Sequence, residues 1–344
     1  MDIPSTSRHE RAITDHLAAL LAAAPWLEVT RLGENLVART RLGRPLRLLL
    51  AGHTDTVPAN HNDRARVEGD VCWGLGSCDM KGGVAVLAEL ARTVAEPAVD
   101  VTYVFYECEE IEAQYNGIER LFRERPELLV ADAAILAEPS GARVEAGCQG
   151  TMRARLTYTG VRAHSARAWL GRNAIHRLAP TLTMLAAYEP REVEIDGCVF
   201  REGLQAVGVG GGVAGNVVPD RAALTVNFRF APDRSADAAE AHVRELLGDA
   251  DDFELIDMAP GAVPSLGHPL LTALLAAVGR PAEAKLGWTD VSRFAARGVP
   301  ATNFGPGDPS WAHHADERVT RADLESVYLV LKNLLEGADP QLDA

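Results

Sequence analysis

The stretch LLLAGHTDTVPA, from Leu48 to Ala59, joins a short apolar run to a histidine and an aspartate. An apolar run of this length predicts a strand buried on both faces, and the glycine after it lets the backbone turn out of the sheet. His53 then lies at the carboxyl end of the strand, where open α/β sheets place their ligands. A histidine that only caps the strand and hydrogen-bonds a turn is equally compatible with this stretch alone.

Length, charge and cysteine content limit the kinds of protein that this chain can be. Its 344 residues, 47% of them hydrophobic, are enough for two domains with separate cores. A formal charge of -14 argues against binding to a nucleic-acid backbone or an anionic membrane, but not against a small anionic substrate. The sequence shows no signal peptide, no apolar run long enough to span a bilayer and no C-x-x-C pair. We therefore expect a cytoplasmic protein with reduced thiols.

The order of the predicted elements indicates an α/β protein with a second domain inserted into the first. Ser7 to Glu10 has the pattern of a capping box before a first helix. Strands and helices then alternate, which predicts a mostly parallel sheet flanked by helices. From Thr151 the order is β-α-β-β-α-β, with one helix over Asn173 to Tyr188, as in a ferredoxin-like α+β sandwich. We expect a catalytic domain formed by residues 1–150 and 264–344, and an inserted lid or dimerisation domain formed by residues 151–263.

Side chains that can bind metal ions follow the predicted strands of the first domain. Unpaired acids are costly to bury, so metal ions are suitable partners for them. One metal ion would bind His53 and Glu138, and a second would bind Glu110 and His313. Asp79, just before a predicted helix, would bridge the two with one oxygen on each. Such nitrogen and oxygen ligands suit two Zn²⁺ ions, with Co²⁺ or Mn²⁺ as possible substitutes.

Two further acids lie beside these predicted ligands. Asp55, two residues after His53, could hold the other imidazole nitrogen, or it could only shape the turn that follows. Glu109 could take a proton from the attacking water and return it to a leaving amine, unless it is a solvated surface charge. A thiolate zinc site made by Cys72 and Cys78 is a further alternative, although their spacing is poor for it.

Five motifs, in order, resemble those of the dinuclear zinc aminoacylase and carboxypeptidase family of metallopeptidases and deacylases. The motifs are GHTDTVP, GLGSCDMKGG, CEE, AEPS and HHADE, and the resemblance covers essentially the whole chain. It implies a zinc-exopeptidase-like catalytic domain with the ligands given above. It also implies that Glu109 is the general base and that Asp55 orients His53 in the catalytic site. The form His-x-x-Asp-Glu of the last motif selects His313 rather than His314.

Within the family the likeness is greatest to members that hydrolyse N-succinyl-L,L-2,6-diaminopimelate to succinate and L,L-2,6-diaminopimelate, in lysine and cell-wall biosynthesis. The stretches EAGCQGTMR, GGVAGNVVPD and GWTDVSRF are among those that carry it. The family pattern implies that the substrate is held by Asn216, Arg229, Thr289 and Arg293. Guanidinium groups and hydroxyls suit a substrate with three carboxylates, but each arginine could also be an ordinary surface charge.

The sequence departs from that pattern at one place. The better-known members with this activity carry two arginines where this chain has Cys148 and Gln149, and Thr151 is the only obvious polar replacement. The substrate could therefore also be N-acetylornithine, another N-acyl amino acid or a dipeptide. A homologue without catalytic activity would be expected to lack the general base, whereas Glu109 is present.

The resemblance also implies a homodimer formed through the inserted domain. In the family, the histidine that corresponds to His164, in TGVRAHSARAWLG, reaches the metal centre of the other subunit. An imidazole there could donate a hydrogen bond to the oxyanion of the tetrahedral intermediate. An edge strand or helix face of a ferredoxin-like domain could be buried against its copy by a two-fold axis. His164 could otherwise be an ordinary loop histidine.

Overall fold

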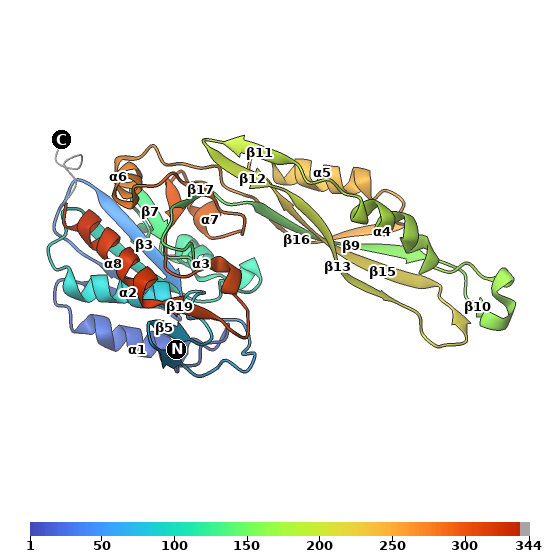
Figure 1. Ribbon diagram of the computed structural model, residues 1–344, viewed down its shortest axis with the longest axis horizontal. Coiled ribbons are helices and arrows are strands. Elements are labelled where there is room, and N and C mark those ends of the chain that lie inside the picture. Colours follow the sequence, from blue (N-terminus) through green and yellow to red (C-terminus); the bar gives the residue numbers. More distant parts are fainter. Residues whose placement is uncertain (338–344) are drawn as a thin grey trace. The chain divides into compact units, whose positions relative to one another are not determined.

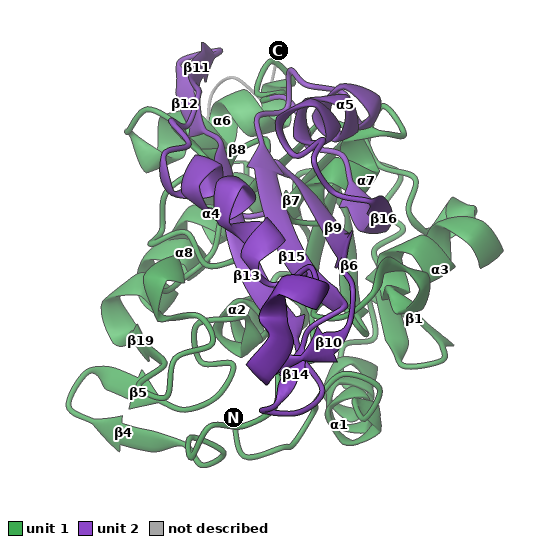
Figure 2. Ribbon diagram, turned by 90° about the vertical axis from the view of Figure 1, so that its right-hand side faces the viewer, with its two compact units in different colours: residues 1–147, 264–284, 289–344 green, residues 148–263, 285–288 purple. Residues whose placement is uncertain are grey.

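The computed structural model describes residues 1–337, which divide into two compact units (Figures 1 and 2). Unit 1 contains residues 1–147, 264–284 and those from 289 onward, and unit 2 contains residues 148–263 and 285–288. The short segment 285–288 thus belongs to unit 2, although it lies within the sequence of the second part of unit 1. Within the described residues, no helix is both long enough and apolar enough to cross a membrane.

The central sheet of unit 1 has the strand order β1-β2-β6-β3-β7-β18-β8-β17. These strands are β1 (Glu28–Leu32), β2 (Asn35–Arg39), β3 (Arg47–His53), β6 (Asp100–Tyr106), β7 (Ala133–Leu136), β8 (Glu145–Ala146), β17 (Glu283–Ala284) and β18 (Ala301–Asn303). Strands β6, β3, β7 and β18 run parallel, whereas β2 pairs antiparallel with β1 and β6, and β8 with β18. The predicted α/β class with a mostly parallel sheet is confirmed.

Helices cover both faces of this sheet. They are α1 (Arg11–Ala22), α2 (Lys81–Thr93), α3 (Gly117–Glu124), α6 (Pro269–Val278), α7 (Val291–Ala295) and α8 (Arg321–Leu335). Helices α1, α2, α6 and α8 pack on one face, and α3 and α7 lie on the other (Figure 2). Successive side chains of a strand point to opposite faces, so Leu48 and Leu50 join the core under α2 while Leu49 faces the other way. Burial on both faces explains why these strands are continuous apolar runs.

Two features near the start of unit 1 differ from the prediction. Helix α1 begins only at Arg11, and its N-cap residue Glu10 makes no side-chain cap bond, so the predicted capping box is wrong. The hydroxyl of Ser7 instead donates a hydrogen bond to the carboxylate of Asp55, which shows that tertiary partners override the local pattern. The sequence also did not predict a small antiparallel sheet, because three-residue strands show no clear period. Its strands are β4 (Arg66–Glu68), β5 (Val71–Trp73) and β19 (Arg318–Thr320).

Unit 2 is built on a four-stranded antiparallel sheet in the order β13-β15-β9-β16, with two helices. Its elements are β9 (Gly150–Thr159), α4 (Ala179–Ala186), β13 (Gly203–Gly211), β15 (Arg221–Phe230), α5 (Ala236–Leu246) and β16 (Asp252–Ala259). This is the predicted β-α-β-β-α-β order. Alternate residues of β9, from Met152 to Tyr158, form a core with residues of α4 and α5.

Three parts of unit 2 were not predicted correctly. Helix α4 begins at Ala179 rather than Asn173, because a 3₁₀ turn precedes it and Pro180 lies in its first turn, where proline is well tolerated. A hairpin of β11 (Glu192–Ile195) and β12 (Cys198–Arg201) follows α4. A short antiparallel pair joins β10 (Ala163–His164) to β14 (Val217–Val218).

Candidate metal centre

Neighbouring strands of unit 1 end side by side and carry several of the predicted site residues. His53, the last residue of β3, is the register partner of Tyr106, the last residue of β6. Glu109 and Glu110 follow β6 after a short turn, and Glu138 follows the parallel strand β7. Parallel strands place their carboxyl ends at one edge, so the sheet itself brings these residues together.

Two ligand-type residues reach this edge from loops. Asp79 lies just before α2, and its Oδ1 is 3.1 Å from Nε2 of His53. Its Oδ2 is 3.6 Å from Nε2 of His313, which lies between η5 (Pro309–Trp311) and β19. The same nitrogen of His313 is 3.1 Å from Oε1 of Glu110. Asp79 therefore has one oxygen near each imidazole.

This donor set fits two divalent metal ions. Ligand atoms of His53, Asp79 and Glu110 all lie within 4.8 Å of one another. The charge of the buried Glu138 acts on His53, and His313 contacts both Asp79 and Glu110. A carboxylate with one oxygen toward each imidazole has the arrangement expected of a bridging ligand, and imidazole and carboxylate donors suit zinc. The structure thus clusters four of the five residues that the sequence indicated as ligands, and it places Glu138 near enough for its charge to act on His53.

Carboxylates raise the pKa of both histidines. The hydrogen bond to Glu110 is the main reason why the pKa of His313 is raised to about 9. Burial lowers the pKa of His53, but hydrogen bonds to Asp55 and Asp79 outweigh it and hold this pKa well above its usual value. A histidine must be neutral to bind a metal ion, so binding of a metal ion by these histidines would release protons and would be favoured by higher pH.

Asp55 is fully buried and binds more than the imidazole. Its carboxylate accepts the backbone N–H groups of Glu109 (3.0 Å) and Glu110 (3.1 Å) and the hydroxyl of Ser7 (2.7 Å). Nδ1 of His53 is 3.1 Å from the carbonyl oxygen of Asp55 and 3.4 Å from its carboxylate. Asp55 therefore contacts His53, as its predicted role requires, and it also fixes the backbone that carries Glu109 and Glu110.

Glu109 has the environment of a proton acceptor rather than that of a surface charge. Burial raises its pKa well above the usual value for glutamate. The positive charge of His53 lowers this pKa in part, while the nearby Glu138, Asp290 and Glu110 raise it further. A carboxylate with a raised pKa is matched to proton transfer closer to neutral pH.

Sequence reasoning missed Glu317, which holds the loop that carries Asp79. Its carboxylate accepts the backbone N–H groups of Gly76 (2.9 Å), Cys78 (2.9 Å) and Asp79 (3.0 Å). Glu317 is 1% exposed, so these three bonds replace the water that a charged carboxylate otherwise binds. The signal in the sequence is the last residue of the HHADE motif, which is Glu317 itself.

The two predicted substrate residues of unit 1 are mostly buried. Thr289 is 3% exposed and precedes α7. Arg293, on α7, forms an ion pair with Asp290 one helical turn earlier and donates to Glu119 at 3.0 Å. Asn116 also donates to Asp290. A substrate carboxylate would therefore compete with two carboxylates of the chain for Arg293, which the sequence did not indicate.

The predicted residues of unit 2 form two groups. Thr151 and Arg229 are register partners on β9 and β15. His164 is the register partner of Val217 on β14, and the carbonyl of Asn216 accepts the N–H of the residue after His164. The register of β9 and β15 puts the first group at one end of the sheet, whereas β10 and β14 follow the other end.

The positions that depart from the family pattern are also part of unit 2. Cys148 and Gln149 are both buried. The side-chain amide of Gln149 donates to the carbonyl of Arg201 at 2.7 Å, and the backbone of Cys148 pairs with that of Ala262. Gln149 therefore serves the packing of unit 2 in this structure.

The cysteines give no support to a thiolate metal site. All five are free thiols. Within residues 1–337, neither group of three or more potential ligands contains Cys72 or Cys78.

Known proteins are similar to this chain over nearly its whole length. Residues 49–337 match the sequence profile of peptidase family M20/M25/M40. A Mycobacterium tuberculosis H37Rv protein named putative succinyl-diaminopimelate desuccinylase DapE is 53% identical over 98% of this chain and 96% of its own length. A Corynebacterium glutamicum protein named succinyl-diaminopimelate desuccinylase is 47% identical over 97% of this chain and 94% of its own length.

Solved structures share the fold at much lower sequence identity. A tripeptidase from Staphylococcus aureus is 19% identical, with a TM-score of 0.79, and the match covers 100% of this chain and 96% of that one. A Bacillus subtilis protein, described as a dinuclear metal-binding peptidase of the M20 family, is 17% identical with a TM-score of 0.70. The match covers 98% of this chain and 94% of that one.

Proposed function

Because the chain belongs to peptidase family M20/M25/M40, we propose that it is a dinuclear metal hydrolase that cleaves N-succinyl-L,L-2,6-diaminopimelate to succinate and L,L-2,6-diaminopimelate. The observation that carries the proposal is the cluster of His53, Asp79, Glu110 and His313 beside the half-buried Glu109, in a chain 47–53% identical to proteins named for this activity. The reaction belongs to lysine and cell-wall biosynthesis. The free cysteines support the cytoplasm as its compartment.

The proposed metal ligands are His53, Asp79, Glu110, Glu138 and His313, and the proposed metal is Zn²⁺. Bound there, the two ions would lower the pKa of water and stabilise the negative charge that develops on the amide oxygen. The observed short distances from Asp79 to both imidazoles support its role as the bridging ligand. Asp55 and Glu317 would keep the ligand-bearing loops in place through backbone hydrogen bonds.

Glu109 would move the proton during hydrolysis. Its carboxylate takes a proton from the attacking water and later delivers it to the nitrogen of the leaving amine. The raised pKa favours both steps, because a stronger base accepts the proton more readily and the protonated form persists until the amine leaves.

Unit 2 would supply the contacts to the rest of the substrate. We assign substrate carboxylates to Arg229, supported by its register partner Thr151. Asn216 and His164, which lie beside each other at the other end of the sheet, would contact a second part of the substrate. In unit 1, Thr289 would offer its hydroxyl and Arg293 its guanidinium, although Arg293 already has two carboxylate partners.

The distance between the two groups of unit 2 supports a site shared by two subunits. The eight-residue step from Thr151 to Thr159 on β9 spans about 27 Å at ~3.4 Å per residue. This separation favours a site in which Arg229 and His164 come from different chains. We therefore propose a homodimer in which each site receives His164 from the second copy. Nδ1 of His164 accepts the N–H of Ala166 at 3.1 Å, so a neutral ring carries its proton on Nε2, ready for donation to an oxyanion.

The direct test is amine release from N-succinyl-L,L-2,6-diaminopimelate and from N-acetylornithine, with the protein loaded with zinc or treated with a chelator. We expect turnover of the succinyl substrate that disappears on chelation and returns with Zn²⁺, because the water nucleophile needs the metal ions. Faster turnover of N-acetylornithine, or of a dipeptide added as a third substrate, would assign the chain to another activity of the family. Turnover that survives complete metal removal would contradict the metal mechanism itself.

A further inference from the structure

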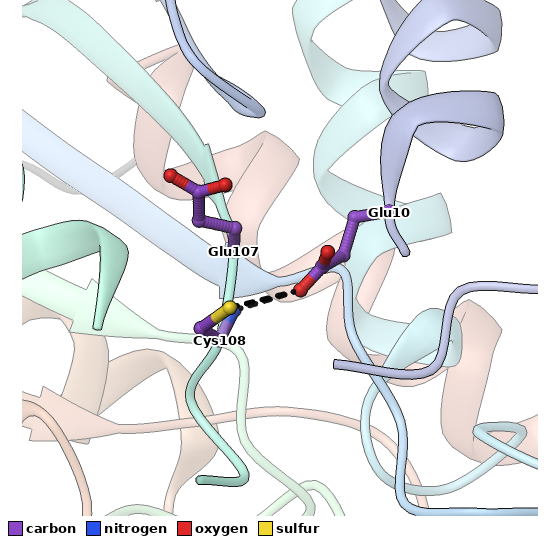
Figure 3. Close-up of side chains that lie close together, drawn as sticks. All are labelled: Glu10, Glu107 and Cys108. Carbon is purple, nitrogen blue, oxygen red and sulfur yellow. Dashed lines mark hydrogen bonds between the residues drawn. The ribbon is translucent and has the colours of Figure 1, made fainter. Parts of the chain in front are cut away.

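Glu10 connects the start of the chain to the segment that carries the proposed general base. Glu10 is 1% exposed, and its Oε1 accepts hydrogen bonds from both the backbone N–H (3.1 Å) and the thiol (3.3 Å) of Cys108 (Figure 3). The two residues are 98 positions apart in the sequence. Oε1 also accepts the N–H of Arg8, which fixes the approach of the N-terminal segment.

The segment after β6 is held by side chains instead of by the sheet. Four consecutive backbone N–H groups, those of residues 107–110, each donate to a side-chain oxygen. The acceptors in order are Asn35 Oδ1, Glu10 Oε1, Asp55 Oδ1 and Asp55 Oδ2, at 3.1, 3.1, 3.0 and 3.1 Å. The direction in which this segment leaves the sheet therefore depends on three residues from other parts of the chain.

Cys108 is the point at which this segment turns. Its φ of 58° lies in the left-handed region, which residues other than glycine rarely adopt. Such a conformation persists only when surrounding contacts hold it. Glu10 contacts both the backbone N–H and the side chain of Cys108, so it is the neighbour that restrains this turn most directly.

A purely local role for Glu10 does not explain these contacts. Glu10 is the N-cap residue of α1, yet its side chain makes no cap bond to that helix. The side chain of Ser7, three residues earlier, also does not cap the helix. It donates a hydrogen bond to Asp55, which accepts the backbone N–H groups of Glu109 and Glu110. The segment from Ser7 to Glu10 thus contacts both the turn at Cys108 and Asp55, the residue that holds the next part of the turn.

We propose that Glu10 is a positioning residue for catalysis: it fixes the turn at Cys108, so that Glu109 and Glu110 leave β6 toward the other site residues. The catalytic part of this role rests on the proposed function, whereas the placement of the turn can be measured without a substrate. Glu10 would act through its hydrogen bonds to Cys108, and we assign it no contact with the substrate.

The test compares Glu10→Ala and Glu10→Gln with the matched control Asp15→Asn, an exposed acid on the same helix. Displacement of catalytic groups by about 1 Å costs on the order of 10²-fold in rate, so we expect Glu10→Ala to lower kcat about 10-fold to 100-fold with a much smaller change in KM. Glu10→Gln keeps a carbonyl oxygen for Cys108 and should restore most of kcat. Both variants should lose thermal stability. In Glu10→Gln an amide nitrogen takes the place of Oε2, which is buried without a hydrogen-bond partner among the described residues, so this nitrogen stays unsatisfied. Glu10→Ala removes the acceptor of the N–H groups of Arg8 and Cys108.

Amide hydrogen exchange supplies the second readout. In Glu10→Ala the backbone N–H groups of residues 108–110 should exchange faster, while those of Asp15→Asn should keep the native rate. The proposal is overturned if Glu10→Ala loses stability but keeps kcat within twofold, if the Ala and Gln variants lose kcat equally, or if exchange at 108–110 is unchanged. If the native protein fails to cleave the succinyl substrate, the proposed function is wrong, and the exchange measurement still decides the role of Glu10 in placing the turn.

Discussion

At the scale of single residues, burial and neighbouring acids raise the pKa of Glu109. The deprotonated form is the base, so kcat/KM should fall as the pH decreases through this pKa. We expect Glu109→Gln to keep both metal ions, to lower kcat by ~10²-fold to 10⁴-fold, and to lack this acidic limb in its residual activity. Elemental analysis and pH–rate profiles check this, with the exposed neighbour Glu112 changed to Gln as the control. Near-native turnover of Glu109→Gln would remove it from the mechanism.

At the scale of elements, the connection between β5 and α2 depends on one carboxylate from the segment before β19. Glu317 accepts three backbone N–H groups of this connection, including that of Asp79. In Glu317→Gln one of the two acceptor oxygens becomes a donor that faces other donors, so Asp79 should be held less firmly. Loss of a partner that orients a ligand typically costs about 10-fold to 100-fold in metal affinity, and we expect a loss in this range. Competition with a chelating dye measures it, with the exposed Glu325→Gln on α8 as control; equal affinities for the two variants would refute this role.

At the scale of the whole molecule, the long sheet of unit 2 separates His164 from Arg229 and so predicts catalysis across subunits. We expect activity to rise when the weakly active Glu109→Gln dimer is mixed with the weakly active His164→Ala dimer under subunit exchange. One site of each hybrid then carries both lesions and the other carries neither. His164→Ala alone should lower kcat about 10²-fold to 10³-fold, as expected for one lost oxyanion donor. If mass spectrometry shows hybrids and activity does not return, His164 does not act on the partner's site.

Much of the site could be predicted because its chemistry is concentrated in short motifs at strand ends. His53, Glu110 and Glu138 follow apolar runs that are recognisable as buried strands, and parallel strands bring such ends to one edge. The prediction was wrong where residues of a local pattern form hydrogen bonds with residues far away in the sequence. Ser7 and Glu10 have the spacing of a capping box, but their side chains bind Asp55 and Cys108. Hydrogen bonds over such sequence separations leave no periodic signal.

The amino-acid sequence by itself determined the α/β class, the alternation of strands and helices, and the residue types available for metal chemistry. These properties depend on burial and on chain-local geometry, which residue order expresses directly. Only the tertiary structure decided which oxygen faces which nitrogen, as with Asp79 between His53 and His313. It also decided that Glu10, Asp55 and Glu317 bind the backbone of the ligand-bearing loops. The reason is physical: a buried carboxylate binds whatever donors packing brings to it, and packing joins residues that are far apart along the chain.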